Sequence, residues 1–135
     1  MRWSIDFPIP ASNFPISHSS KVVSLGSCFA QTIGKKMQAA KFEVLINPFG
    51  TLFHPLNLAE LLQLAIPAAP MNPAGVVERE GVFVHYKAHS DVKGATVAEL
   101  EANYTQQMQL LHHSLKKATH LVLTLGTAWL YTHRE

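Results

Sequence analysis

Hydrophobic and polar positions form blocks along the chain, and each block has the period of one kind of element. Short runs of β-branched and aliphatic residues predict three buried strands, at 21–25, 42–46 and 121–125. Between them, apolar residues recur at steps of three or four, which predicts amphipathic helices. Two further short runs flank Glu80-Gly81 and predict a β-hairpin over 76–86.

Capping residues help to place the three predicted helices. The first follows the first strand, and its apolar stripe consists of Phe29, Ile33, Met37 and Ala40. Asn57 and Glu60 resemble a capping box, so we expect the second helix to begin there and to end at Pro67. Thr96 and Glu99 form a similar pair before the longest helix. Its buried stripe is expected to consist of Val97, Leu100, Tyr104, Met108, Leu111 and Leu115.

The order strand, helix, strand, helix, hairpin, helix, strand predicts an α/β domain over residues 21–135. We expect a parallel sheet in which the first strand is central, with the second strand on one side and the third on the other. Right-handed crossovers then place the first helix and the longest helix on opposite faces. The run 121–125 is nearly all apolar, which is typical of a strand covered on both faces.

Residues 1–20 are rich in proline and serine and show no period. We interpret them as an extended N-terminal arm that lies on the domain, with Trp3, Phe7 and Phe14 as anchors.

Composition excludes several classes of protein. The chain has 135 residues, 47% hydrophobic and 15% charged, which suits one globular domain. A formal net charge of +2 without a basic stripe argues against nucleic-acid binding, and no run of about 20 apolar residues predicts a membrane span. The single cysteine excludes an intrachain disulfide and a cysteine-rich zinc site. The first residues lack the apolar run of a secretory signal, so we expect a cytoplasmic protein without metal or cofactor.

Glycine-bearing segments follow all three strands of the predicted sheet. They are Gly26-Ser27-Cys28, Asn47-Pro48-Phe49-Gly50 and Gly126-Thr127-Ala128-Trp129. Ligands of open parallel sheets bind at the carboxyl ends of the strands, and N–H groups beside glycines can stabilise an oxyanion there. The alternative is that these are ordinary turn glycines.

Ser27 and Cys28 are the candidate nucleophiles because they lie where the first strand meets its helix. The positive end of the helix dipole there favours a thiolate. The alternatives are structural: Ser27 as a helix N-cap and Cys28 as a small buried hydrophobe.

The string Ser24-Leu25-Gly26-Ser27-Cys28-Phe29-Ala30 resembles the signature of the GSCFA family of bacterial proteins. Further matching segments follow in order: Asn47-Pro48-Phe49-Gly50-Thr51 with Pro55, His89-Ser90, and Thr124-Leu125-Gly126-Thr127-Ala128-Trp129-Leu130-Tyr131. That family is similar to the SGNH (GDSL-type) hydrolases. The resemblance implies a flavodoxin-like three-layer α/β/α fold with a parallel sheet, and an esterase or acyltransferase that acts on a small acyl ester.

The nucleophile block of SGNH hydrolases is Gly-Asp-Ser. Aligned on Gly26, it places Cys28 at the nucleophile, whereas a slip of one residue places Ser27 there. The sequence leaves both alternatives open. The second block supplies a glycine N–H, for which Gly50 is the match.

The third block is Gly-x-Asn-Asp, and here the chain departs from the pattern. Gly126 and Thr127 fit its start, but Ala128 replaces the asparagine of the oxyanion hole. Asn47 is the residue that would compensate.

The catalytic Asp and His of SGNH hydrolases follow the last strand, whereas this chain stops at Glu135. We therefore expect a portion of a longer domain, truncated after the third parallel strand and lacking its usual general base. Within the chain, His89 matches a family position, and His54 follows Gly50 closely. These two are the candidate site histidines.

The sequence leads to an enzyme hypothesis and to one alternative from another class. The first is an SGNH-like ester hydrolase or acyltransferase that uses Ser27 or Cys28. The alternative is a non-catalytic module of the same fold that binds a small ligand, which Ala128 favours. A phosphate-binding domain ranks last, because no lysine follows the first glycine as it does in a phosphate loop. If the third strand is an edge, its apolar face predicts self-association with another copy.

Overall fold

The structure is a computed structural model and describes residues 7–129. Trp3 and the end of the last matching segment lie outside the described residues. The elements are β1 (Lys21–Gly26), α1 (Cys28–Ala39), β2 (Glu43–Ile46), α2 (Pro55–Ala65), a short 3₁₀ turn (Pro73–Gly75), β3 (Val76–Arg79), β4 (Val82–His85), β5 (Lys93–Gly94), α3 (Val97–Lys117) and β6 (His120–Thr124).

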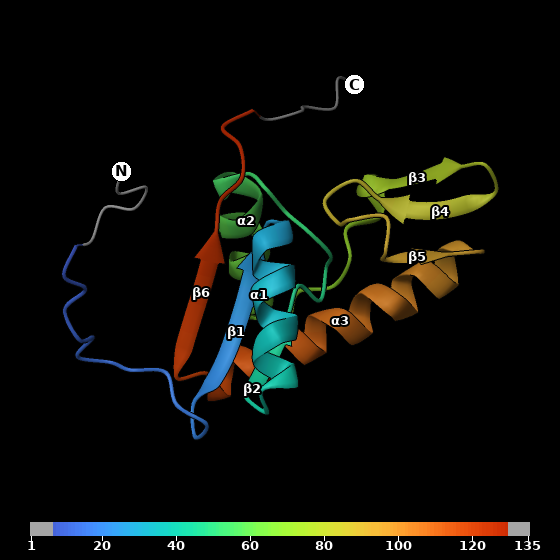
Figure 1. The fold of residues 1–135 in the computed structure, drawn as a ribbon. Helices are drawn as coiled ribbons and strands as arrows, with labels where there is room; N and C mark the ends of the chain where they lie inside the picture. Colours follow the sequence, from blue (N-terminus) through green and yellow to red (C-terminus); the bar gives the residue numbers. More distant parts are fainter. Residues whose placement is uncertain (1–6, 130–135) are drawn as a thin grey trace.

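The main sheet has the order β2-β1-β6, and both pairs of strands are parallel (Figure 1). Val23 of β1 lies beside Leu45 of β2 and Leu121 of β6. This confirms the predicted α/β class and the position of the first strand between the other two.

Helices cover both faces of this sheet. On one face, α1 approaches so closely that a Cβ added at Gly34 would lie 2.7 Å from the Ile46 side chain. On the other face, Val23 and Leu25 belong to one buried cluster with residues of α2 and α3. Figure 1 shows α1 in front of the sheet and α3 behind it. The predicted placement of these two helices on opposite faces is confirmed, while the wider flavodoxin-like architecture stays a prediction.

A small antiparallel sheet of β3, β4 and β5 lies beside the main sheet (Figure 1). The turn between β3 and β4 is Glu80-Gly81, whose φ angles are 52° and 78°. Two successive positive φ angles are typical of the type I′ turn that matches strand twist. The predicted hairpin is therefore confirmed.

Two helix predictions need correction. Helix α1 buries Ala30 and Gly34, whereas Phe29 is 61% and Ile33 is 38% exposed. The face of α1 that contacts the sheet consists of small residues, because larger side chains would not allow so close an approach. The predicted stripe of larger apolar residues lies beside that face. Helix α2 begins at Pro55 and not after Asn57.

Helix α3 follows the prediction more closely. Thr96 is its N-cap and accepts a hydrogen bond from the Glu99 N–H at 3.1 Å. Glu99 in return accepts from the N–H of Ala95 at 2.8 Å. The stripe residues Leu100, Tyr104, Met108 and Leu111 are buried. The prediction that Val97 is buried is wrong, because its position in the first turn leaves it 42% exposed.

The last strand and the N-terminal arm are less covered than expected. On β6, Leu121 and Leu123 are 45% and 44% exposed, so coverage on both faces is wrong for the described residues. Phe7 and Phe14 are exposed and do not anchor the arm. The arm is held instead near its end, where the His18 ring stacks on Phe42 with centroids 4.1 Å apart. Pairing of β6 with another copy stays a prediction.

In residues 7–129 no helix is long and apolar enough to cross a membrane.

Candidate functional site

The corner between β1 and α1 is built on Gly26. Its φ angle is 132°, and a Cβ there would lie 2.0 Å from the backbone oxygen of Thr124. Only glycine allows β6 to approach this closely. The carboxyl ends of β1 and β6 are therefore in direct contact, as expected for the first and third glycine-bearing segments.

Ser27 is buried and serves as the N-cap of α1. Its Oγ accepts a hydrogen bond from the Phe29 N–H at 3.3 Å and lies 3.0 Å from Thr124 Oγ1. Its N–H donates to the Thr124 backbone oxygen at 3.1 Å and to Thr124 Oγ1 at 3.0 Å. The structural interpretation of Ser27 as a cap is confirmed.

Cys28 is the first residue of α1 and is exposed. Its interpretation as a buried hydrophobe is therefore wrong: the first turn of α1 projects it outward while Ala30 faces the sheet. Among the described residues, the N–H groups of Cys28 and Ala30 have no hydrogen-bond partner. Such unpartnered donors are a general property of helix N-termini, and they can receive a negatively charged oxygen.

Asn47 connects the corner to the segment after β2. Its Oδ1 accepts from the Gly26 N–H at 2.8 Å, and its Nδ2 donates to Gln31 Oε1 at 3.3 Å. Its backbone oxygen accepts from the Gly50 N–H at 2.8 Å. Because these groups are satisfied within the fold, Asn47 positions Gly26 and Gly50.

His89 packs directly on Gly50. A Cβ on Gly50, whose φ angle is 74°, would lie 2.3 Å from the Cβ of His89. The His89 N–H donates to the Phe49 backbone oxygen at 3.0 Å, which fixes this contact. His89 Nδ1 accepts a hydrogen bond from the Asp91 N–H at 3.3 Å and lies 3.2 Å from Asp91 Oδ2. Its Nε2 has no partner among the described residues. The structure thus brings Gly26, Asn47, Gly50 and His89 into one connected set.

Gly126 and Thr127 contact a different segment. The Gly126 N–H donates to the Phe53 backbone oxygen at 3.0 Å, and the Thr127 N–H approaches the same oxygen at 3.4 Å. His54 is the N-cap of α2: its Nδ1 accepts from Leu56 N–H at 3.1 Å. Its Nε2 therefore carries the proton and donates to the Ala128 oxygen at 3.2 Å. His54 joins α2 to the segment after β6, and both of its ring nitrogens are occupied.

A cavity of about 450 Å³ opens at the carboxyl end of β2. Its polar wall consists of Asn47, Gly50, Asp91, Asn103 and Gln107. Ser27, Cys28, Gly126 and Thr127 are not part of its lining. This cavity therefore does not join all of the predicted site residues. A single pocket that contains them all stays a prediction.

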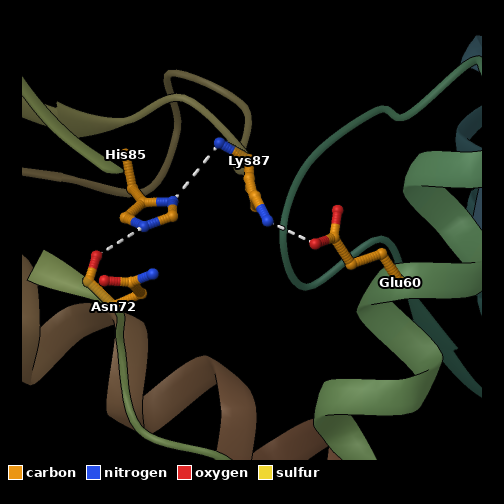
Figure 2. A network of polar contacts seen from close by, with 4 residues as sticks. All are labelled: Glu60, Asn72, His85 and Lys87. Carbon is orange, nitrogen blue, oxygen red and sulfur yellow. Dashed lines mark hydrogen bonds and ion pairs between the residues drawn. The ribbon is translucent and has the colours of Figure 1, made fainter. Parts of the chain in front are cut away.

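A second polar cluster joins the hairpin to α2 (Figure 2). Buried His85 accepts the Lys87 N–H at Nδ1, 3.3 Å away, so its Nε2 donates to the Asn72 oxygen at 3.0 Å. Burial lowers the pKa of His85, which favours the neutral ring. The Lys87 side chain forms an ion pair with Glu60, and this hydrogen bond raises the pKa of Lys87.

Tyr104 connects this cluster to the segment after β2. Its ring lies edge-on to Phe49 at 5.0 Å and tilted to His85 at 5.5 Å between centroids. Burial raises the pKa of Tyr104. Through Phe49, these contacts anchor the segment before Gly50 in the buried core. In residues 7–129 no group of three or more metal-ligating side chains comes together.

Sequence reasoning missed Thr124, Asp91, Asn103 and Gln107. Thr124 contacts Ser27 from a strand 97 positions away, so no local pattern reveals it. Asn103 and Gln107 are four residues apart on α3, beside the buried stripe. This spacing places them on one face of the helix, and it was the signal in the sequence that could have identified them.

Comparison with protein families gives one result. The sequence model of the GSCFA family matches residues 21–135. Comparisons with curated proteins and with solved structures find no match. The family match covers every helix and strand from β1 to β6, including the corner at Gly26, the Asn47–Gly50 segment and the segment after β6. The chain therefore belongs to the GSCFA family.

Proposed function

We propose that this GSCFA domain performs acyl transfer on a small ester, as an SGNH-like ester hydrolase or acyltransferase with Cys28 as nucleophile. One contrast carries the proposal. Cys28 is exposed at the start of α1, whereas the Ser27 hydroxyl is buried between the Phe29 N–H and Thr124. A nucleophile has to reach a carbonyl carbon, and Ser27 would have to give up its cap to do so.

In the proposed reaction, the Cys28 thiol gives its proton to a general base as its sulfur attacks the ester carbonyl, and the same group passes that proton to the departing alcohol. Water or an acceptor alcohol then attacks the thioester, and the proton it loses passes through the same group to the departing sulfur of Cys28. The unpartnered N–H group of exposed Cys28 is a suitable donor for the oxyanion. His89 is the candidate acid and base at Nε2, which has no partner among the described residues. In the structure Nδ1 accepts the Asp91 N–H at 3.3 Å, so the neutral ring carries its proton on Nε2. Action as a base requires the other tautomer, which the Asp91 carboxylate 3.2 Å from Nδ1 would stabilise.

Turnover of p-nitrophenyl acetate by the full chain and its variants tests the proposal. We expect Cys28→Ala to abolish turnover and His89→Gln to lower it by about 10²- to 10⁴-fold. The matched control is His113→Gln, an exposed histidine on α3, which should leave turnover unchanged. Turnover that survives Cys28→Ala would overturn the proposal.

A second candidate is the non-catalytic module that binds a small ligand. The observation that favours it is the internal use of groups expected to face a substrate: the Asn47 amide and the N–H groups of Gly50 and Gly126 all bond within the fold. Wild-type turnover no faster than that of a free thiol at equal concentration would favour this module over the enzyme.

A further inference from the structure

The cavity at the end of β2 has an acceptor-rich wall. Asn103 donates its Nδ2 hydrogen to the Lys93 oxygen at 2.8 Å, which leaves its Oδ1 as an acceptor. The amide of half-buried Gln107 has no partner among the described residues, so it can both donate and accept. Asp91 adds a carboxylate at the rim, where it is mostly exposed.

The remaining walls of the cavity are apolar. Ile46 and Pro48 come from the end of β2 and the residues after it, and buried Val92 completes the apolar part of the lining. A compatible ligand therefore needs hydroxyl groups for the amide side chains and C–H groups for the apolar residues of the lining. A compact ion does not meet this requirement, because one exposed carboxylate is the only charged side chain in the lining.

The size of the cavity, about 450 Å³, lies within the range of small-molecule sites. We propose that this cavity binds a neutral, hydroxyl-rich group of about one sugar ring, with Gln107 and Asn103 hydrogen-bonded to its hydroxyls. The proposal concerns binding and is independent of acyl chemistry at Cys28. Asn47 lines the cavity and also accepts the hydrogen bond of the Gly26 N–H. The bound group would therefore lie next to the residue that positions the corner between β1 and α1.

Titration of the ¹⁵N-labelled full chain with a neutral methyl hexopyranoside, followed by NMR, tests this proposal. We expect saturable shifts of the Gly50 and Val92 backbone signals and of the Asn103 and Gln107 side-chain amides. Acetate and methylammonium, used at equal concentrations, should not saturate these signals. Absence of saturation with the glycoside, or saturation with either ion instead, would overturn the proposal.

Neighbouring glutamines provide a matched pair of variants. Gln107→Leu removes one neutral hydrogen-bonding group from the cavity, so we expect the dissociation constant to rise about 2- to 10-fold. Gln106 is exposed and outside the lining, so Gln106→Leu should leave binding unchanged. If Gln107→Leu fails to fold, Asp91→Ala at the exposed rim replaces it and should also weaken binding. Equal effects of Gln106→Leu and the cavity variant would contradict the assignment.

Discussion

Replacement of Gly26 by alanine tests the contact between β1 and β6. The new Cβ would lie 2.0 Å from the Thr124 oxygen and 2.8 Å from its Oγ1, so the strands have to separate. Separation weakens the hydrogen bonds from the Ser27 N–H to Thr124, which costs about 1 to 3 kcal/mol. Backbone strain at a φ of 132° adds about 1 to 3 kcal/mol. We expect Gly26→Ala to lower the free energy of unfolding by about 2 to 6 kcal/mol.

Gly81→Ala is the matched control, because Gly81 also has a positive φ, 78°, but nothing lies within 4 Å of its added Cβ. Only backbone strain applies there, about 1 to 2 kcal/mol. Urea unfolding of both variants, followed by circular dichroism, gives the comparison. A loss of stability in Gly26→Ala no larger than that in Gly81→Ala would refute the proposed steric contact.

Three further predictions concern stability. Thr96→Ala removes the cap of α3 and should lower the free energy of unfolding in urea by about 1 kcal/mol. Thr105→Ala, at an exposed position in the middle of that helix, should leave it unchanged. Equal losses in the two variants would contradict the role of Thr96 as the cap. Because burial lowers the pKa of His85, the unfolded chain takes up the proton more readily, so stability should fall as pH drops below about 6.5. His85→Gln should reduce this slope between pH 7.5 and 5.5, and an unchanged slope would exclude His85 as its source. The Lys87–Glu60 pair is partly exposed, so Lys87→Gln should cost no more than about 1 kcal/mol, and a larger loss would show a buried role.

The sequence predicted those features that depend on local pattern. Three apolar runs gave the parallel sheet, and Glu80-Gly81 gave the hairpin because few residue pairs adopt two positive φ angles. Thr96 and Glu99 identified the start of α3 because their reciprocal bonds span only a few residues. The GSCFA signature identified the corner at Gly26.

Features that depend on tertiary packing were missed. The buried face of α1 was misplaced because it consists of Ala30 and Gly34, whose small size carries no hydrophobic signal. The start of α2 was misplaced because histidine, at position 54, is an uncommon N-cap. The role of Ser27 depends on Thr124, which only the pairing of β1 with β6 brings near.

The central claim is that Cys28 supplies the reactive atom of the corner while Ser27 serves as a helix cap. Peptide mapping by mass spectrometry, after brief incubation of the folded chain with p-nitrophenyl acetate, tests it most directly. The account predicts an acetyl group on Cys28 that forms much more slowly, at the rate of a free thiol, when the chain is unfolded before the reagent is added at the same pH. An acetyl group on Ser27, or acetylation of Cys28 that is equally fast in the unfolded chain, would contradict it.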